Sequence, residues 1–148
     1  MLLKTRITED MKTAMRSKDG DQLSAIRLLL AAIKQREVDE RIDLSDIQVM
    51  EVIEKMLKQR RDSICQYEAA KRYDLADVEK FESRLLQSYL PDPLTEEEIA
   101  TLLVQAIGQT GAAGIKDMGK VMLAVKPQLV GRADMSKVSA QIKARLGG

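Results

Sequence analysis

The stretch LQSYLPDPLTEEEI, residues 86–99, decides how this chain is organised. Its two prolines, Pro91 and Pro93, cannot continue a helix and favour an extended link. Thr95 and Glu98 follow at the spacing of a capping box, which predicts that a new helix begins directly after the link. We therefore expect an N-terminal helical domain over residues 1–90 and a C-terminal domain over residues 91–148.

Upstream of this link, apolar residues recur at steps of three and four, the period of an amphipathic helix. The pattern predicts four helices, which begin near Leu3, after Asp19, after Ser45 and near Leu75. Ser45 and Gln48 have the spacing of another capping box. Since no segment alternates as a strand does, the expected fold class is all-α, with a four-helix N-terminal region.

Downstream of the link, the sequence predicts a three-helix bundle. One helix follows Thr95 and ends in a loop over residues 108–114, another covers residues 116–126, and the last covers residues 134–146. Pro127 and Gly131 are expected to lie in the connection between the last two helices. Gly119 falls inside the middle helix, where glycine costs about 1 kcal/mol relative to alanine. We expect Gly119 and Gly131 to be structural, with another backbone packed closely against Gly119.

Composition excludes several kinds of chemistry. Histidine is absent, which removes the usual general base and imidazole metal ligand. The single cysteine, Cys65, cannot form an intramolecular disulfide, and we expect it to face inward as a small hydrophobic residue. No phosphate-binding loop, metal-ligand spacing or catalytic pair is found. We therefore expect no catalytic residue, no metal site and no cofactor.

No apolar run approaches the roughly 20 residues that a membrane-spanning helix needs. The N-terminal residues show no signal-peptide core, and Glu9 and Asp10 are unusual in a transit peptide. From these features we expect no membrane partner and a cytoplasmic location.

Basic residues are concentrated near the C-terminus. From Ala113 onward, seven Lys or Arg residues face two acids, a net charge of +5, whereas residues 1–90 hold 17 of each sign. A neutral body with a basic helical tail favours a polyanion partner, most often RNA, although a solvated surface can have the same composition. With few aromatic side chains, stacking of bases is not expected. The candidate RNA-binding residues are Lys116, Lys120, Lys126, Arg132 and Lys137.

Two further groups of basic residues lie in the N-terminal half. Arg27 interrupts an apolar run, and Lys34 follows seven residues later on the same side. Lys58, Arg60 and Arg61 form the other group. Because acids are numerous on the neighbouring helices, salt bridging is the favoured interpretation of both.

The segment KDMGKVMLAVKPQLVGRADMSKVSAQIKARL, residues 116–146, resembles the GatB/YqeY family, especially in its MGKVM and GRAD elements. Residues 23–39 (LSAIRLLLAAIKQREVD) and 87–99 (QSYLPDPLTEEEI) are similar to stand-alone YqeY proteins, so the resemblance covers nearly the whole chain. It implies an all-helical fold in two parts. It also implies similarity to the tail of GatB, a subunit of the glutamine-dependent amidotransferase that acts on misacylated Glu-tRNA or Asp-tRNA, where the tail helps to hold the tRNA.

The resemblance implies a tRNA-associated binding module. Its expected partners are tRNA or another structured RNA, and a protein of tRNA aminoacylation or amidation. The family carries the label of a carbon–nitrogen ligase with glutamine as amido-N-donor, but the GatB body and the glutamine-hydrolysing subunit have no counterpart here, so no catalysis is expected from this chain alone. The residues that match the tail pattern are Lys116, Gly119, Lys120, Gly131 and Arg132.

Two other functions are left open by the residues. A protein–protein interaction adaptor would use the long third helix or an apolar groove between the halves. A free-standing accessory enzyme of amidation would need aspartate or lysine chemistry, because histidine is absent.

Overall fold

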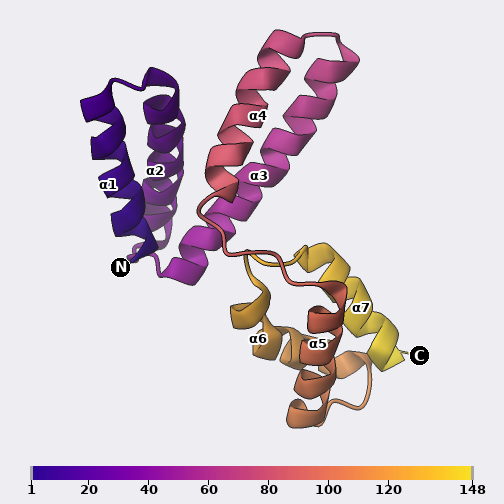
Figure 1. The fold of residues 1–148 in the computed structure, drawn as a ribbon. Helices are drawn as coiled ribbons and strands as arrows, with labels where there is room; N and C mark the ends of the chain where they lie inside the picture. The colour runs from indigo at the N-terminus through magenta and orange to yellow at the C-terminus, as the bar shows by residue number, and fades with distance from the viewer. Residues whose placement is uncertain (1, 148) are drawn as a thin grey trace. The chain divides into compact units, whose positions relative to one another are not determined.

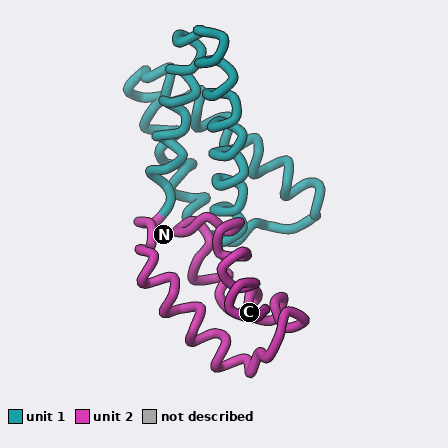
Figure 2. Tube along the Cα trace, turned by 90° about the vertical axis from the view of Figure 1, so that its right-hand side faces the viewer, with its two compact units in different colours: residues 1–90 teal, residues 91–148 magenta. Residues whose placement is uncertain are grey.

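The computed structural model describes residues 2–147, and every regular element within them is helical (Figure 1). The all-α class expected from the sequence is confirmed. The chain divides after residue 90 into an N-terminal unit with α1 to α4 and a C-terminal unit with α5 to α7 (Figure 2). The elements are α1 (Leu3–Ser17), α2 (Gly20–Glu40), α3 (Asp46–Ala69), α4 (Tyr73–Gln87), α5 (Glu96–Thr110), the 3₁₀ turn η1 (Ile115–Asp117), α6 (Met118–Leu129) and α7 (Met135–Gly147).

The N-terminal unit consists of two helical hairpins, α1–α2 and α3–α4 (Figure 1). α2 begins where the Asp19 side chain accepts a hydrogen bond from the Gln22 N–H at 3.1 Å. α3 begins with the predicted capping box. The Ser45 hydroxyl accepts from the Gln48 N–H at 3.3 Å, and the Gln48 side chain accepts from the Ser45 N–H at 2.9 Å. Both contacts satisfy backbone donors that a helix start leaves unpaired.

The core of the N-terminal unit collects apolar side chains from all four of its helices. Ile7, Ile26, Ile53 and Leu86, one from each helix, are at most 2% exposed. The last buried residue of α3 is Leu57, so the C-terminal half of this helix adds none to the core. Cys65 lies in that half and is exposed, so its expected inward orientation is wrong.

The α3–α4 hairpin is held by charge beyond this core. The Arg60 guanidinium lies 3.2 Å from a Glu79 oxygen and 2.7 Å from a Glu82 oxygen. Burial, together with the neighbouring Glu79 charge, raises the pKa of Glu82, and Arg60 only partly opposes this. The expected salt bridging is therefore confirmed for Arg60. Lys58 and Arg61 are exposed and form no ion pair within residues 2–147.

The C-terminal unit packs α5 and α7 against α6 around a small apolar core. Leu103, Val121, Leu129 and Ile142 are fully buried in it. The predicted capping box before α5 is confirmed. The Thr95 hydroxyl accepts from the Glu98 N–H at 3.1 Å, and the Glu98 side chain accepts from the Thr95 N–H at 3.2 Å.

Two helices of this unit extend beyond their predicted ends. α5 includes Gly108 and continues to Thr110, so the expected loop begins later, at Gly111, whose φ is 66°. α6 continues through Pro127 to Leu129, because burial of Val125 and Leu129 favours another turn although proline removes one backbone donor. Pro127 therefore lies inside a helix and not in the connection.

The two glycines that were expected to be structural differ. Gly131 has a φ of 77°, a left-handed conformation that other residues rarely adopt, so it has the expected structural role. Gly119 is the second residue of α6 and is exposed, and a Cβ built on it meets no atom within 4 Å. The close backbone contact expected at Gly119 is therefore wrong.

Candidate nucleic-acid interface

The five candidate RNA-binding residues are distributed over three segments of the C-terminal unit. Lys116 lies in η1, Lys120 and Lys126 lie near the two ends of α6, Arg132 lies in the α6–α7 connection, and Lys137 lies in the first turn of α7. Lys116, Lys120 and Lys137 are exposed, whereas Lys126 and Arg132 are half-buried. The five are thus unequally available to a partner.

Lys116 and Lys120 are brought together around one carboxylate, Asp117. An Asp117 oxygen accepts a hydrogen bond from the Ala113 N–H at 2.9 Å, and this bond is the main reason why the pKa of Asp117 is lowered. The charges of Lys120 and Lys116 lower it further. We call residues 113–120 the basic turn. Its two ammonium groups share one acid, so it carries a net charge of +1.

The backbone of the basic turn favours anion binding at the same place. The Asp117 N–H donates to the Gly114 carbonyl at 2.9 Å and closes η1, after which α6 begins at Met118. No side chain caps the start of α6 among the described residues, and no acid lies in its first turn. The Met118 N–H donates to the Ile115 carbonyl, so η1 already pairs the first donor of α6. The positive end of the α6 dipole can still attract a phosphate here, although the Asp117 carboxylate lies at the same helix start.

Arg132 is engaged within the unit. Its side-chain Nε donates to the Asp92 carbonyl at 2.9 Å, and its own carbonyl accepts from the Leu94 N–H at 2.9 Å. These two bonds fix the segment that precedes α5 against the α6–α7 connection. Arg132 therefore has a structural function, and only its terminal nitrogens remain for a phosphate.

The charge of the C-terminal unit is segregated. Residues 91–148 contain seven basic and six acidic residues, a net charge of +1. Four of the acids precede Ala113, and three of these form the first turn of α5. There Glu98 has a lowered pKa, chiefly because it accepts hydrogen bonds from Thr95. The positive field thus belongs to the segment from the basic turn onward.

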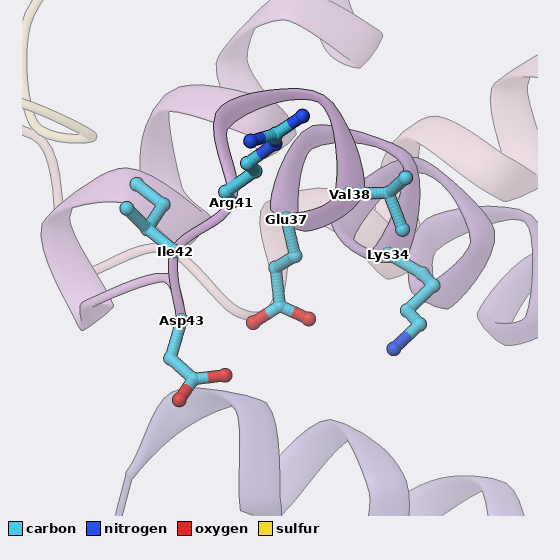
Figure 3. A pocket seen from close by; sticks show the side chains of 6 residues that line it. All are labelled: Lys34, Glu37, Val38, Arg41, Ile42 and Asp43. Carbon is cyan, nitrogen blue, oxygen red and sulfur yellow. The ribbon is translucent and has the colours of Figure 1, made fainter.

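The sequence interpretation missed a shallow depression on the N-terminal unit, at the end of α2 (Figure 3). Its carboxylates include Glu37, which is already paired. Glu37 lies 2.6 Å from the Lys4 ammonium and accepts from the Leu44 N–H at 3.0 Å. Lys4 is the main cause of its lowered pKa. The depression is lined by Lys34, Glu37, Val38, Arg41, Ile42 and Asp43.

Neither a metal centre nor a membrane span is found in the part of the chain that the structure describes. Over residues 2–147, no three Cys, Asp or Glu side chains gather as metal ligands would. None of the helices in this range has the length and apolarity needed to cross a bilayer.

Comparison with known proteins shows similarity over nearly the whole chain. The profile of the family described as "Yqey-like protein" matches residues 4–146. A Kluyveromyces lactis protein named "Altered inheritance of mitochondria protein 41, mitochondrial" is 34% identical over 105 residues, which cover 68% of this chain and 56% of that protein. A protein of the same name from Clavispora lusitaniae is 33% identical over 105 residues, 70% of this chain and 61% of its own length. The chain thus spans little more than half the length of these two relatives.

A third relative with this name, from Pyrenophora tritici-repentis, is 32% identical over 149 residues, 96% of this chain and 80% of its own length. All three names describe mitochondrial proteins, which contradicts the cytoplasmic location expected from the sequence. That expectation was wrong because it rested on missing signals, and a helical protein of this composition is compatible with either compartment.

Proposed function

Because the chain belongs to the Yqey-like protein family, we propose that it is a tRNA-associated binding module whose C-terminal unit contacts the phosphate backbone. The observation that carries this proposal is the basic turn. There two exposed ammonium groups, Lys116 and Lys120, flank the start of α6, where no side chain caps the helix. The similarity of residues 116–146 to the tail of GatB supports tRNA as the RNA.

The five basic residues have different tasks in this proposal. Lys116, Lys120 and Lys137 contact phosphates, because their side chains are exposed. Arg132 holds the segment before α5 in place and adds at most one phosphate contact, since its Nε is already bonded to Asp92. Lys126 is half-buried and contributes less.

Recognition of this kind depends on shape and backbone charge. Residues 91–148 contain no aromatic side chain, so no base can stack on an aromatic ring of this unit. Lysines bind phosphates as point charges and carry little sequence information. The proposal therefore assigns the holding of tRNA to this chain, and no bond-making step.

The test is fluorescence anisotropy of labelled bulk tRNA with the full chain, over a series from low to physiological salt. We expect saturable binding whose logarithm falls steeply with the logarithm of the salt concentration. Lys116→Ala with Lys120→Ala should weaken binding and reduce the salt slope by up to about two counterions.

The matched control is Lys55→Ala with Lys58→Ala on α3, which removes two exposed positive charges from the other unit. This variant should keep the wild-type slope. An unchanged slope in the basic-turn variant, or no saturable binding at low salt, would refute the proposal.

A further inference from the structure

The solvent-exposed face of α2 has a pattern that RNA binding does not explain. Five residues, Leu28, Ala31, Gln35, Val38 and Ile42, follow one another at steps of three, four, three and four, the spacing of a coiled-coil seam. All five are exposed, and three of them are large apolar residues: Leu28 is 47%, Val38 is 59% and Ile42 is 39% exposed. We call these five residues the α2 seam. Its last member lies just beyond the end of α2.

A row of cations runs along one edge of the α2 seam. Arg27 and Lys34 lie seven residues apart on α2, about 10 Å along its axis. Arg41, seven residues further on, is the left-handed C-cap of α2, and Figure 3 shows its guanidinium pointing away from Lys34. All three are exposed, and none forms an ion pair within residues 2–147. The salt bridging expected for Arg27 and Lys34 is thus absent from this part of the chain. In contrast, Arg36 on another side of the same helix pairs with Glu40 and Glu51.

Few acids lie near this row, and two of them, Asp39 and Glu37, already have partners on the chain. Asp39, at the other edge of the seam, accepts a hydrogen bond from Gln35 at 2.9 Å. Glu37 is bound by Lys4, and the Lys34 charge also contributes to its lowered pKa. Figure 3 shows the Lys34, Glu37 and Asp43 side chains on the same side of the depression at the end of α2. Glu37 and Asp43 thus partly oppose the Lys34 charge at that end.

We propose that the α2 seam docks an acidic amphipathic helix of a protein partner. Apolar residues of the incoming helix would cover Leu28 and Val38, and carboxylates at its edge would face Arg27 and Lys34. Charged residues that flank a seam determine which partner helix binds. A row of positive charges favours a partner with negative charges at the facing positions. This inference is independent of the proposed function, because it uses none of the residues of the basic turn.

Charge also argues against a second copy of the chain as the occupant. In an antiparallel pairing, the basic rows of two α2 helices would lie against each other and repel. In a parallel pairing, Lys34 would meet Asp39 of the other copy, whereas Arg27 would meet Ala32 and gain no acid. A phosphate backbone would satisfy the cations but would leave the three large apolar side chains uncovered.

The probe is a helical peptide of about three heptads with Leu at the seam positions and Glu at both flanking positions. A matched peptide has Lys in place of each Glu, and a third, with Ser in place of each Leu, keeps only the negative charge. Glu-flanked copies repel one another, which keeps the peptide available for binding. Fluorescence anisotropy measures the binding of each peptide to the full chain. We expect the Glu peptide to bind at least tenfold more tightly than the other two.

Charge reversal locates the site. Arg27→Glu with Lys34→Glu should reverse the preference, so that the Lys peptide binds more tightly than the Glu peptide. The control Lys55→Glu with Lys58→Glu changes the net charge equally on α3 and should keep the wild-type preference. Because all four side chains are exposed, none of these changes removes a core contact.

Leu28→Ser with Val38→Ser leaves the charge unchanged and should weaken binding of the Glu peptide about tenfold. Three results would overturn the proposal: equal binding of the Glu peptide and its Ser counterpart, an equal loss of preference in the α3 control, or undiminished binding to the Leu28/Val38 variant. Self-association of the wild-type chain that Leu28→Ser with Val38→Ser abolishes, measured by sedimentation equilibrium, would also overturn it in favour of a second copy.

Discussion

Single residues in the C-terminal unit have clearly separated tasks. Gly131 makes the turn between α6 and α7 with a φ of 77°. Arg132 next to it fixes the segment before α5 through Asp92. Lys116 and Lys120 are left exposed beside Asp117. The first two stabilise the fold, and only the lysines are wholly available to a partner.

Gly119 and Gly131 should respond in opposite ways to alanine. Gly131→Ala forces a left-handed conformation on a residue with a Cβ, and should lower the free energy of unfolding by about 1–2 kcal/mol. Gly119→Ala meets open space in a helix and should raise that free energy by up to about 1 kcal/mol. Urea denaturation followed by circular dichroism measures both. A loss of stability in Gly119→Ala would contradict the open surroundings of this residue.

The pKa of Glu82 is raised and that of Glu37 is lowered, so the two carboxylates should change the stability of the fold in opposite directions as the pH rises. The pKa of Glu82 is raised by burial and by the Glu79 charge, so the folded chain binds this proton more tightly than the unfolded chain. Its contribution to stability therefore falls as the pH rises from the ordinary pKa of a glutamate through the raised value. Glu82→Gln should be more stable than wild type at pH 7, and the difference should vanish at low pH.

Glu37 has a lowered pKa because of Lys4 and the Leu44 N–H, so its contribution is present above the ordinary pKa and is lost as the pH falls through the lowered value. Glu37→Gln should be less stable than wild type at pH 7, again with convergence at low pH. Urea denaturation at several pH values tests both variants. The same sign of change in the two variants at pH 7 would contradict the assigned causes.

At the scale of the elements, the two capping boxes fix where α3 and α5 begin. Ser45→Ala and Thr95→Ala each remove a hydroxyl that accepts a backbone N–H, and each should cost about 1 kcal/mol. We propose that the two units fold independently. Ser45→Ala should then reduce only the hydrogen-exchange protection of residues 2–90, and Thr95→Ala only that of residues 91–147. Loss of protection in both units from either change would contradict independence.

The helix starts were predictable because their signals are local. The Ser45 hydroxyl with the Gln48 carboxamide, and the Thr95 hydroxyl with the Glu98 carboxylate, need no tertiary contact to act. The helix ends were less predictable. Pro127 and Gly108 are helix breakers by intrinsic propensity, and both lie inside helices.

The candidate site was predictable only as a charge excess. Which lysines are free depends on contacts between residues distant in sequence, such as that of Arg132 with Asp92. The α2 seam was missed for a related reason. Its apolar residues lie among the core residues of the same helix, so the sequence alone does not show which face the fold leaves exposed.

At the scale of the whole molecule, the two units carry different surfaces. The C-terminal unit has the basic turn, where lysines and a helix start favour phosphate. The N-terminal unit is neutral over residues 1–90 and has the α2 seam, where apolar side chains and cations favour an acidic helix. The two proposed partners, an RNA and an acidic helix, would therefore use different units of the chain.

A titration of the isotope-labelled full chain with tRNA, followed by amide chemical shifts, decides whether the basic turn binds RNA. RNA binding through the basic turn predicts saturable shifts at residues 113–120 and Lys137, with those of α2 and α3 unchanged. Shifts confined to the N-terminal unit, or no shifts at low salt, would contradict the account.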